Sequence, residues 1–94
     1  CKVNEATTKR KRFNIMEIIC IYKNRIFDVA CSYMQEENSL CTYIGEKKTE
    51  NENYEFSAKI RSIFYLPKVL KFLLKQKGLV ELKCRIEIKL LSKF

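Results

Sequence analysis

Two stretches of the chain alternate between apolar and polar residues, and this alternation constrains the fold more than any other feature. In the first, one side carries Tyr54, Phe56, Ala58, Ile60, Ser62 and Phe64. In the second, one side carries Val80, Leu82, Cys84, Ile86, Ile88 and Leu90. Successive side chains of a β-strand point to opposite faces of the sheet, so this pattern predicts antiparallel strands with one buried face.

Three further segments have the composition of strands. Residues 13–22 and 26–34 are rich in isoleucine and aromatic residues, with Lys23, Asn24 and Arg25 between them as a turn. A short strand is expected over residues 40–44, and a charged loop over residues 45–53. The principal prediction is therefore an all-β fold, an immunoglobulin-like antiparallel β-sandwich.

The segment 66–77 fits two structures. Leu66, Val69, Leu70, Leu73 and Leu74 form a helical stripe opposite several lysines. The same segment also fits a strand over residues 69–74. The spacing of the leucines favours a helix, whereas the strands expected on either side favour a strand. Both remain open, and a helix at about 66–77 would make the fold α+β, which is the alternative prediction.

Charge and composition limit the chemistry. The chain has 94 residues, 19 basic against 11 acidic, and a net charge of +8, which favours anionic partners such as nucleic acid, lipid headgroups or glycans. It contains no histidine, the commonest general base near neutral pH and the commonest zinc ligand. The triplet Glu81-Leu82-Lys83 has the form of half a nuclease metal site, but it also fits the solvent side of a strand. We expect no enzyme activity, no catalytic residue, no metal and no cofactor.

The chain divides into two parts. Residues 1–12 are polar, end in four consecutive basic residues, and are expected to form a basic arm. Residues 13–94 are expected to form one domain. No apolar run approaches the roughly 20 residues that a membrane span requires.

Five cysteines, at positions 1, 20, 31, 41 and 84, are many for so short a chain and indicate an oxidising compartment, hence a secreted protein. The alternative is that they are small buried side chains of an intracellular protein. Cys84 lies on the apolar side of its strand, where a disulfide between two sheets would sit. The 64-residue separation of Cys20 from Cys84 suits the bridge of an immunoglobulin-like receptor or adhesion module.

A family resemblance starts at Cys31 and at the segment Gln35-Glu36-Glu37-Asn38-Ser39-Leu40-Cys41. Around it stand Phe13-Asn14-Ile15, Asp28-Val29-Ala30, Gly45-Glu46, Phe56-Ser57 and Pro67-Lys68, followed by Cys84 among alternating apolar residues. In order and spacing, residues 13–94 resemble the ML lipid-recognition family, in particular the branch of lipid-binding co-receptors of Toll-like receptors.

The resemblance implies a disulfide between Cys31 and Cys41 that closes a hairpin, and a second between Cys84 and either Cys1 or Cys20. It also implies two sheets that part to leave an apolar cavity for an acyl chain or a sterol. The expected function is then non-enzymatic: a secreted, immunity-related protein that binds a lipid and presents it to a receptor.

Candidate ligand-binding residues follow from this arrangement. Apolar side chains of the sandwich interior, which could be filled or hollow, are Phe13, Ile15, Phe27, Val29, Phe56, Ile60, Phe64 and Phe72. Cations that could hold an anionic headgroup at the cavity rim are Lys47, Lys48, Lys59 and Arg61. A third hypothesis keeps the cysteines reduced: an intracellular basic α+β module that binds nucleic acid or a protein.

Overall fold

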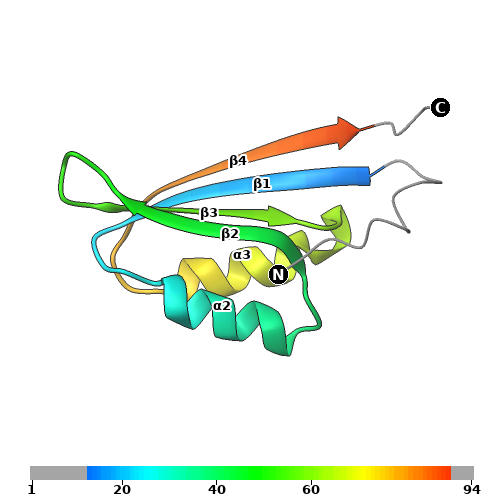
Figure 1. Cartoon of the computed structure of the whole chain (residues 1–94), viewed down its shortest axis with the longest axis horizontal. Coiled ribbons are helices and arrows are strands. Elements are labelled where there is room, and N and C mark those ends of the chain that lie inside the picture. Colours follow the sequence, from blue (N-terminus) through cyan, green and yellow to red (C-terminus); the bar gives the residue numbers. More distant parts are fainter. Residues whose placement is uncertain (1–12, 90–94) are drawn as a thin grey trace.

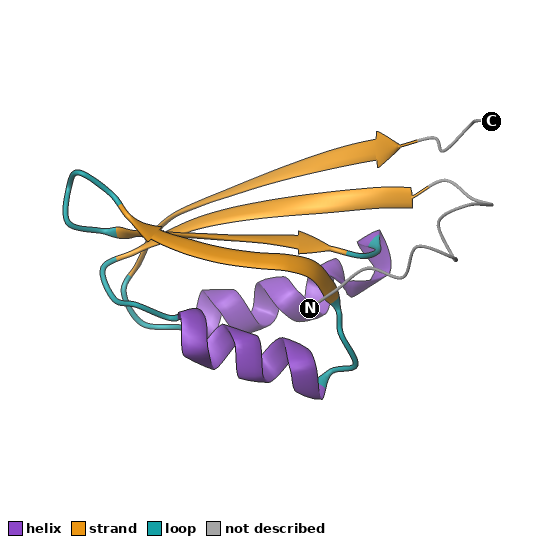
Figure 2. Ribbon diagram, in the orientation of Figure 1, coloured by secondary structure: helices purple, strands orange, loops and turns teal. Residues whose placement is uncertain are grey.

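A computed structural model describes residues 13–89 as one antiparallel sheet with two α-helices on one of its faces (Figures 1 and 2). In chain order the elements are β1 (Phe13–Tyr22), α2 (Phe27–Glu36), β2 (Cys41–Lys48), β3 (Tyr54–Ile60), the short 3-10 helix η1 (Ile63–Tyr65), α3 (Leu66–Lys75) and β4 (Leu79–Lys89).

The four strands of the described part lie in the order β2-β3-β1-β4. Strand β1 pairs antiparallel with both β3 and β4, and β2 pairs antiparallel with β3. Each helix thus joins two parallel strands that have a third strand inserted between them, which is the split β-α-β arrangement, here used twice. Because both crossovers pass on the same side, one sheet face is covered and the other is left open (Figure 2).

The core lies between the covered face and the helices. In β1, Met16, Ile18, Cys20 and Tyr22 are fully buried, which is the period of two that a half-covered strand requires. The register places Cys20 opposite Phe56, and Phe56 is also fully buried.

Helices α2 and α3 supply the other side of this core. Ala30 and Met34 of α2 and Val69 and Leu73 of α3 have no exposed surface. The rings of Tyr33 and Phe72 stack with centroids 4.0 Å apart and so join the two helices.

Helix α3 follows directly on η1. The side chain of Ser62 accepts a hydrogen bond from the backbone N–H of Phe64 and so caps η1, while α3 has no side-chain cap of its own and carries Pro67 in its first turn. Gly78, with φ at +86°, then turns the chain into β4.

The antiparallel sheet that the alternation predicts is confirmed, but residues 13–89 contain a single sheet, where a sandwich needs two. The predicted strand over residues 26–34 is wrong, because this segment forms α2. Ile26, Ala30 and Met34 are four residues apart and all buried, which is a helical period. The alternative helix at 66–77 is confirmed as α3, so the described fold is α+β.

Both alternating segments form strands, with two differences. Strand β3 stops at Ile60, and Phe64, expected on a buried face, is 86% exposed in η1. In β4 the side chains of Val80 and Ile86 are about half exposed, at 52% and 53%. These residues were expected to be buried, but β4 lies at the edge of the described sheet, where a strand has a neighbour on one side only.

The predicted disulfides are not found. Cys20, Cys31 and Cys84 carry free thiols, so Cys31 is not bonded to Cys41, and Cys84 is bonded to neither Cys20 nor Cys1. Cys31 lies in α2 instead of in a hairpin strand, and the register places Cys84 opposite Ile18, two pairs away from Cys20. Cys1 itself and the basic arm of residues 1–12 lie outside the described residues.

Within residues 13–89, neither helix has the length or the apolar character needed to cross a bilayer.

Candidate functional site

The open face of the sheet is the most distinctive surface of the described chain. It carries the alternate side chains of the strands, which point away from the helices, and none of them is buried. The residues of this face whose side chains the structure describes are Ile15, Glu17, Ile19 and Ile21 of β1, Tyr43, Gly45 and Lys47 of β2, Glu55, Ser57 and Lys59 of β3, and Glu81, Lys83 and Arg85 of β4. We call this set the open sheet face.

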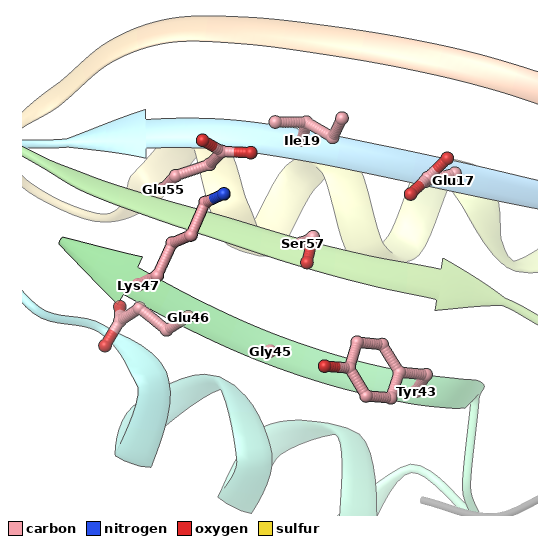
Figure 3. A pocket seen from close by; sticks show the side chains of 8 residues that line it. All are labelled: Glu17, Ile19, Tyr43, Gly45, Glu46, Lys47, Glu55 and Ser57. Carbon is pink, nitrogen blue, oxygen red and sulfur yellow. The ribbon is translucent and has the colours of Figure 1, made fainter. Parts of the chain in front are cut away.

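A depression of about 280 Å³ lies on this face over β2, β3 and β1 (Figure 3). It is lined by Glu17, Ile19, Tyr43, Gly45, Glu46, Lys47, Glu55 and Ser57. A second depression, lined by Glu17, Ile19, Lys83, Cys84 and Arg85, shares two of these residues and continues the concave surface toward β4.

Tyr43 and Gly45 shape the first depression. A Cβ atom placed on Gly45 would lie 2.6 Å from the hydroxyl oxygen of Tyr43 and 3.0 Å from its Cε2 and Cζ atoms. The Tyr43 ring therefore occupies the space in which a side chain at position 45 would stand. The tyrosine is 57% exposed, and Figure 3 shows its ring spread along β2 with the hydroxyl directed toward Gly45.

The charges on the open sheet face are mixed, and part of them are paired. Arg85 forms an ion pair with Glu17. Lys83 Nζ lies 3.5 Å from an Oε atom of Glu81. Lys47 and Lys59 form no ion pair within residues 13–89. Each of them has a carboxylate opposite it in the register, Glu55 for Lys47 and Glu17 for Lys59, with which it forms no ion pair, so these are the cations of the face that could pair with an external anion.

Glu46 is the buried carboxylate at the border of this site, with a side chain only 5% exposed. One of its oxygens accepts a hydrogen bond from the backbone N–H of Ile26 at 3.1 Å, and the other lies 3.3 Å from Arg25 Nε. Glu46 thus satisfies a backbone donor at the start of α2, a helix with no side-chain cap of its own. Its role is to fix α2 to β2.

The predicted ligand-binding apolar residues do not surround one cavity. Phe56 and Ile60 are fully buried in the core, and Phe27 and Phe72 pack against it. Val29 and Phe64 are exposed, at 51% and 86%, while Ile15 lies on the open sheet face. The side chain of Phe13 is outside the described part.

The predicted rim cations also separate. Lys47 and Lys59 lie on the open sheet face. Lys48 pairs with Glu52 at 3.1 Å, and that carboxylate raises the pKa of the lysine. Arg61 Nη1 donates a hydrogen bond to the backbone oxygen of Ser39 at 3.4 Å.

Tyr43, Gly45 and Arg85 were not identified from the sequence as members of a site, and Lys83 was considered only as part of half a nuclease metal site. The signal was present: an aromatic residue and a glycine two positions apart in a strand lie on the same face. The open sheet face itself was not visible in the sequence, because the helix over residues 27–36 was taken for a strand.

The described residues offer no group of three or more histidine, cysteine, aspartate or glutamate side chains that could hold a metal ion. Glu81 and Lys83 form an ion pair with each other on the open sheet face.

Comparison of the chain with family profiles, with curated proteins and with solved structures gave no significant match. The geometry of the open sheet face is therefore the basis for a functional assignment.

Proposed function

We propose that this chain binds nucleic acid through the open sheet face. The observation that carries the proposal is the combination, on one uncovered face, of cations from three strands with an exposed aromatic ring. Lys47 and Lys59 form no ion pair within the described residues, whereas Lys83 and Arg85, toward β4, are paired with Glu81 and Glu17. Phosphate contacts by lysine and arginine supply most of the affinity of non-specific nucleic-acid binding.

The architecture supports the same proposal. A four-stranded antiparallel sheet with helices behind it is the platform on which several RNA-binding modules stack bases. This is an analogy of architecture alone, and the argument for function depends on the side chains of the face. A net charge of +8 on 94 residues adds a long-range attraction to polyanions.

Lipid sequestration, the function implied by the family resemblance, has less support in the geometry. The interior between sheet and helices is occupied by packed side chains, and the residues expected to line a cavity are divided between core, helix surface and open face. The two depressions are open at the surface and bordered by charged residues, whereas lipid sites are concave and mostly apolar.

The proposal is tested by fluorescence anisotropy of labelled oligonucleotides over a range of salt concentrations. The variant is Lys47→Gln/Lys59→Gln, which removes the two unpaired cations of the open sheet face. We expect its affinity to fall and the slope of log K against log salt to decrease in magnitude by about 1.4, two phosphate contacts at about 0.7 each for single strands.

The matched control is Lys71→Gln/Lys75→Gln, which makes the same change of charge on the exposed side of α3, behind the sheet. Equal losses in both variants would mean that binding depends on net charge and has no preferred face, against the proposal. A non-covalent lipid mass in native mass spectra of the natural protein would favour lipid binding instead.

A further inference from the structure

Building on the proposed function, we infer that the ligand is single-stranded nucleic acid and that one of its bases stacks on the Tyr43 ring above Gly45. The position of this ring is the main observation, and the cations beside it are a second one. The base is the part of the ligand that would lie in the depression over β2 and β3.

The Tyr43 ring is available for stacking. It is 57% exposed and contributes nothing to the buried core. Its hydroxyl group makes no hydrogen bond within residues 13–89. The ring lies over the strand in the space that Gly45 leaves open, with one of its sides toward the sheet and the other toward solvent (Figure 3).

Glycine at position 45 has a consequence for both the strand and the ring. Gly45 pairs with Ser57 inside the β2–β3 ladder, a position where glycine weakens a strand because it packs no side chain. Any larger residue would bring its Cβ to 2.6 Å from the Tyr43 hydroxyl, so the exposed tyrosine ring would have to move from this position. A glycine inside a strand often marks the close approach of a ligand, and here it keeps the aromatic ring low on the open face.

The surroundings of the ring suit an unpaired nucleotide. Lys59 stands opposite Tyr43 in the register, and Lys47 lies four residues further along β2, about 13 Å away at the rise of an extended strand. Cations on both sides of the ring can hold the phosphates that flank one base. The Ser57 hydroxyl and the Glu55 carboxylate line the same depression and can bond to the edge of that base.

An exposed ring of this kind distinguishes single strands from duplexes. Bases in a duplex are stacked on one another and present only their edges, whereas a single strand can place the face of a base on an aromatic side chain. Loss of one such stacking contact weakens single-strand binding by about 5- to 150-fold.

The experiment compares three probes by fluorescence anisotropy: a labelled single-stranded decamer, the same strand made entirely of abasic sites, and its duplex. The variants are Tyr43→Ala, Tyr43→Phe and Gly45→Ala, and the control is Phe64→Ala, which removes an exposed aromatic ring from η1. Circular dichroism and thermal melting show that each variant is folded.

We expect wild-type protein to prefer the single strand to the duplex and to the abasic strand. Tyr43→Ala and Gly45→Ala should lower single-strand affinity and leave abasic and duplex affinity unchanged, while Tyr43→Phe and Phe64→Ala should bind like wild type. Loss of affinity in Lys47→Gln/Lys59→Gln together with full affinity in Tyr43→Ala would overturn base stacking and leave the proposed function standing. Absence of binding to all three probes would overturn both.

Discussion

Tyr22 is the largest side chain with no exposed surface, and it is also one of the few buried groups with a polar atom. Its hydroxyl donates a hydrogen bond to the backbone oxygen of Leu73 at 2.7 Å, which ties the end of β1 to the last turn of α3. Burial raises the pKa of Tyr22 above its ordinary value of 10.0. In the folded state the Tyr22 side chain is therefore a neutral, hydrogen-bonded phenol.

Replacement of Tyr22 by phenylalanine should lower the free energy of unfolding by about 1 kcal/mol near neutral pH, the usual net value of such a hydrogen bond. Because the pKa is higher in the folded state, the stability contributed by this group is complete below pH 10 and declines as pH rises above it. Urea titrations between pH 7 and 11 should show a shallower alkaline decline in Tyr22→Phe than in wild type. If the stability of both proteins declines equally with pH, the pKa of Tyr22 does not differ between the folded and unfolded states.

A second group contributes to the alkaline decline. Burial raises the pKa of Cys20 from 9.0 to about 12, so its contribution is complete below pH 9 and is lost between pH 9 and 12. Because Cys20 also raises the pKa of Tyr22 through its charge and a hydrogen bond, the Cys20→Ala variant should lose the part of the decline that begins at pH 9 and weaken the part that begins at pH 10.

At the scale of elements, the attachment of α2 depends on a residue from another element. The N-cap residue of α2, Ile26, has no side-chain acceptor, and its own backbone N–H donates a hydrogen bond to the carboxylate of Glu46 from β2. A carboxylate at a helix N-terminus is also favoured by the helix dipole. The Arg25 guanidinium at 3.3 Å compensates the charge of this nearly buried group.

Glu46→Ala should destabilise the protein by about 1–3 kcal/mol, because it leaves the Ile26 N–H without a partner in a buried site. Glu46→Gln keeps an acceptor for Ile26 and loses the charge interaction with Arg25, so its loss should be smaller. Thermal or urea unfolding measures both. Equal losses in the two variants would show that the charge, and not the cap, is what matters.

The elements also show how much of the fold could be predicted from the sequence. Strand β1 and helix α3 were predictable within two residues, because the isoleucine-rich run of residues 13–22 and the leucine stripe of residues 66–75 each have one dominant pattern. Helix α2 was not, because Phe27, Val29 and Tyr33 favour a strand locally, and the buried Ala30 and Met34 reveal a helical period only once a sheet covers them.

The candidate site was predictable to a smaller extent. Lys47 and Lys59 were singled out, but for the rim of a cavity that the described part does not contain. Their actual proximity to Tyr43 depends on the pairing of β2 with β3, in which the register shifts between Cys41 and Tyr43. A shift of one residue moves every side chain to the opposite face, so an open face cannot be assigned before the register is known.

At the scale of the whole molecule, the covered face of the sheet carries two cysteines that a thiol reagent can distinguish by their exposure. Cys20 lies between sheet and helices with no exposed surface, while Cys84 on β4 is exposed. Access to Cys20 requires the helices to leave the sheet, which is an opening of the whole described fold. The rate at which Cys20 reacts therefore reports global stability.

In a Cys84→Ser background, with reagent dilute enough that the fold recloses faster than the thiol reacts, alkylation followed by intact-mass spectrometry and peptide mapping should show Cys20 reacting in proportion to the globally opened population, and at the full rate of a free thiol in denaturant. A single-stranded oligonucleotide at 100 times its Kd should then slow the native reaction about 100-fold, because a ligand that binds only the folded state stabilises it by about 2.7 kcal/mol. The Lys47→Gln/Lys59→Gln variant should lose this protection at the same oligonucleotide concentration. Rapid labelling of Cys20 in the folded protein would mean that the helices do not close the covered face, and with that the division into a filled core and an open binding face would fail.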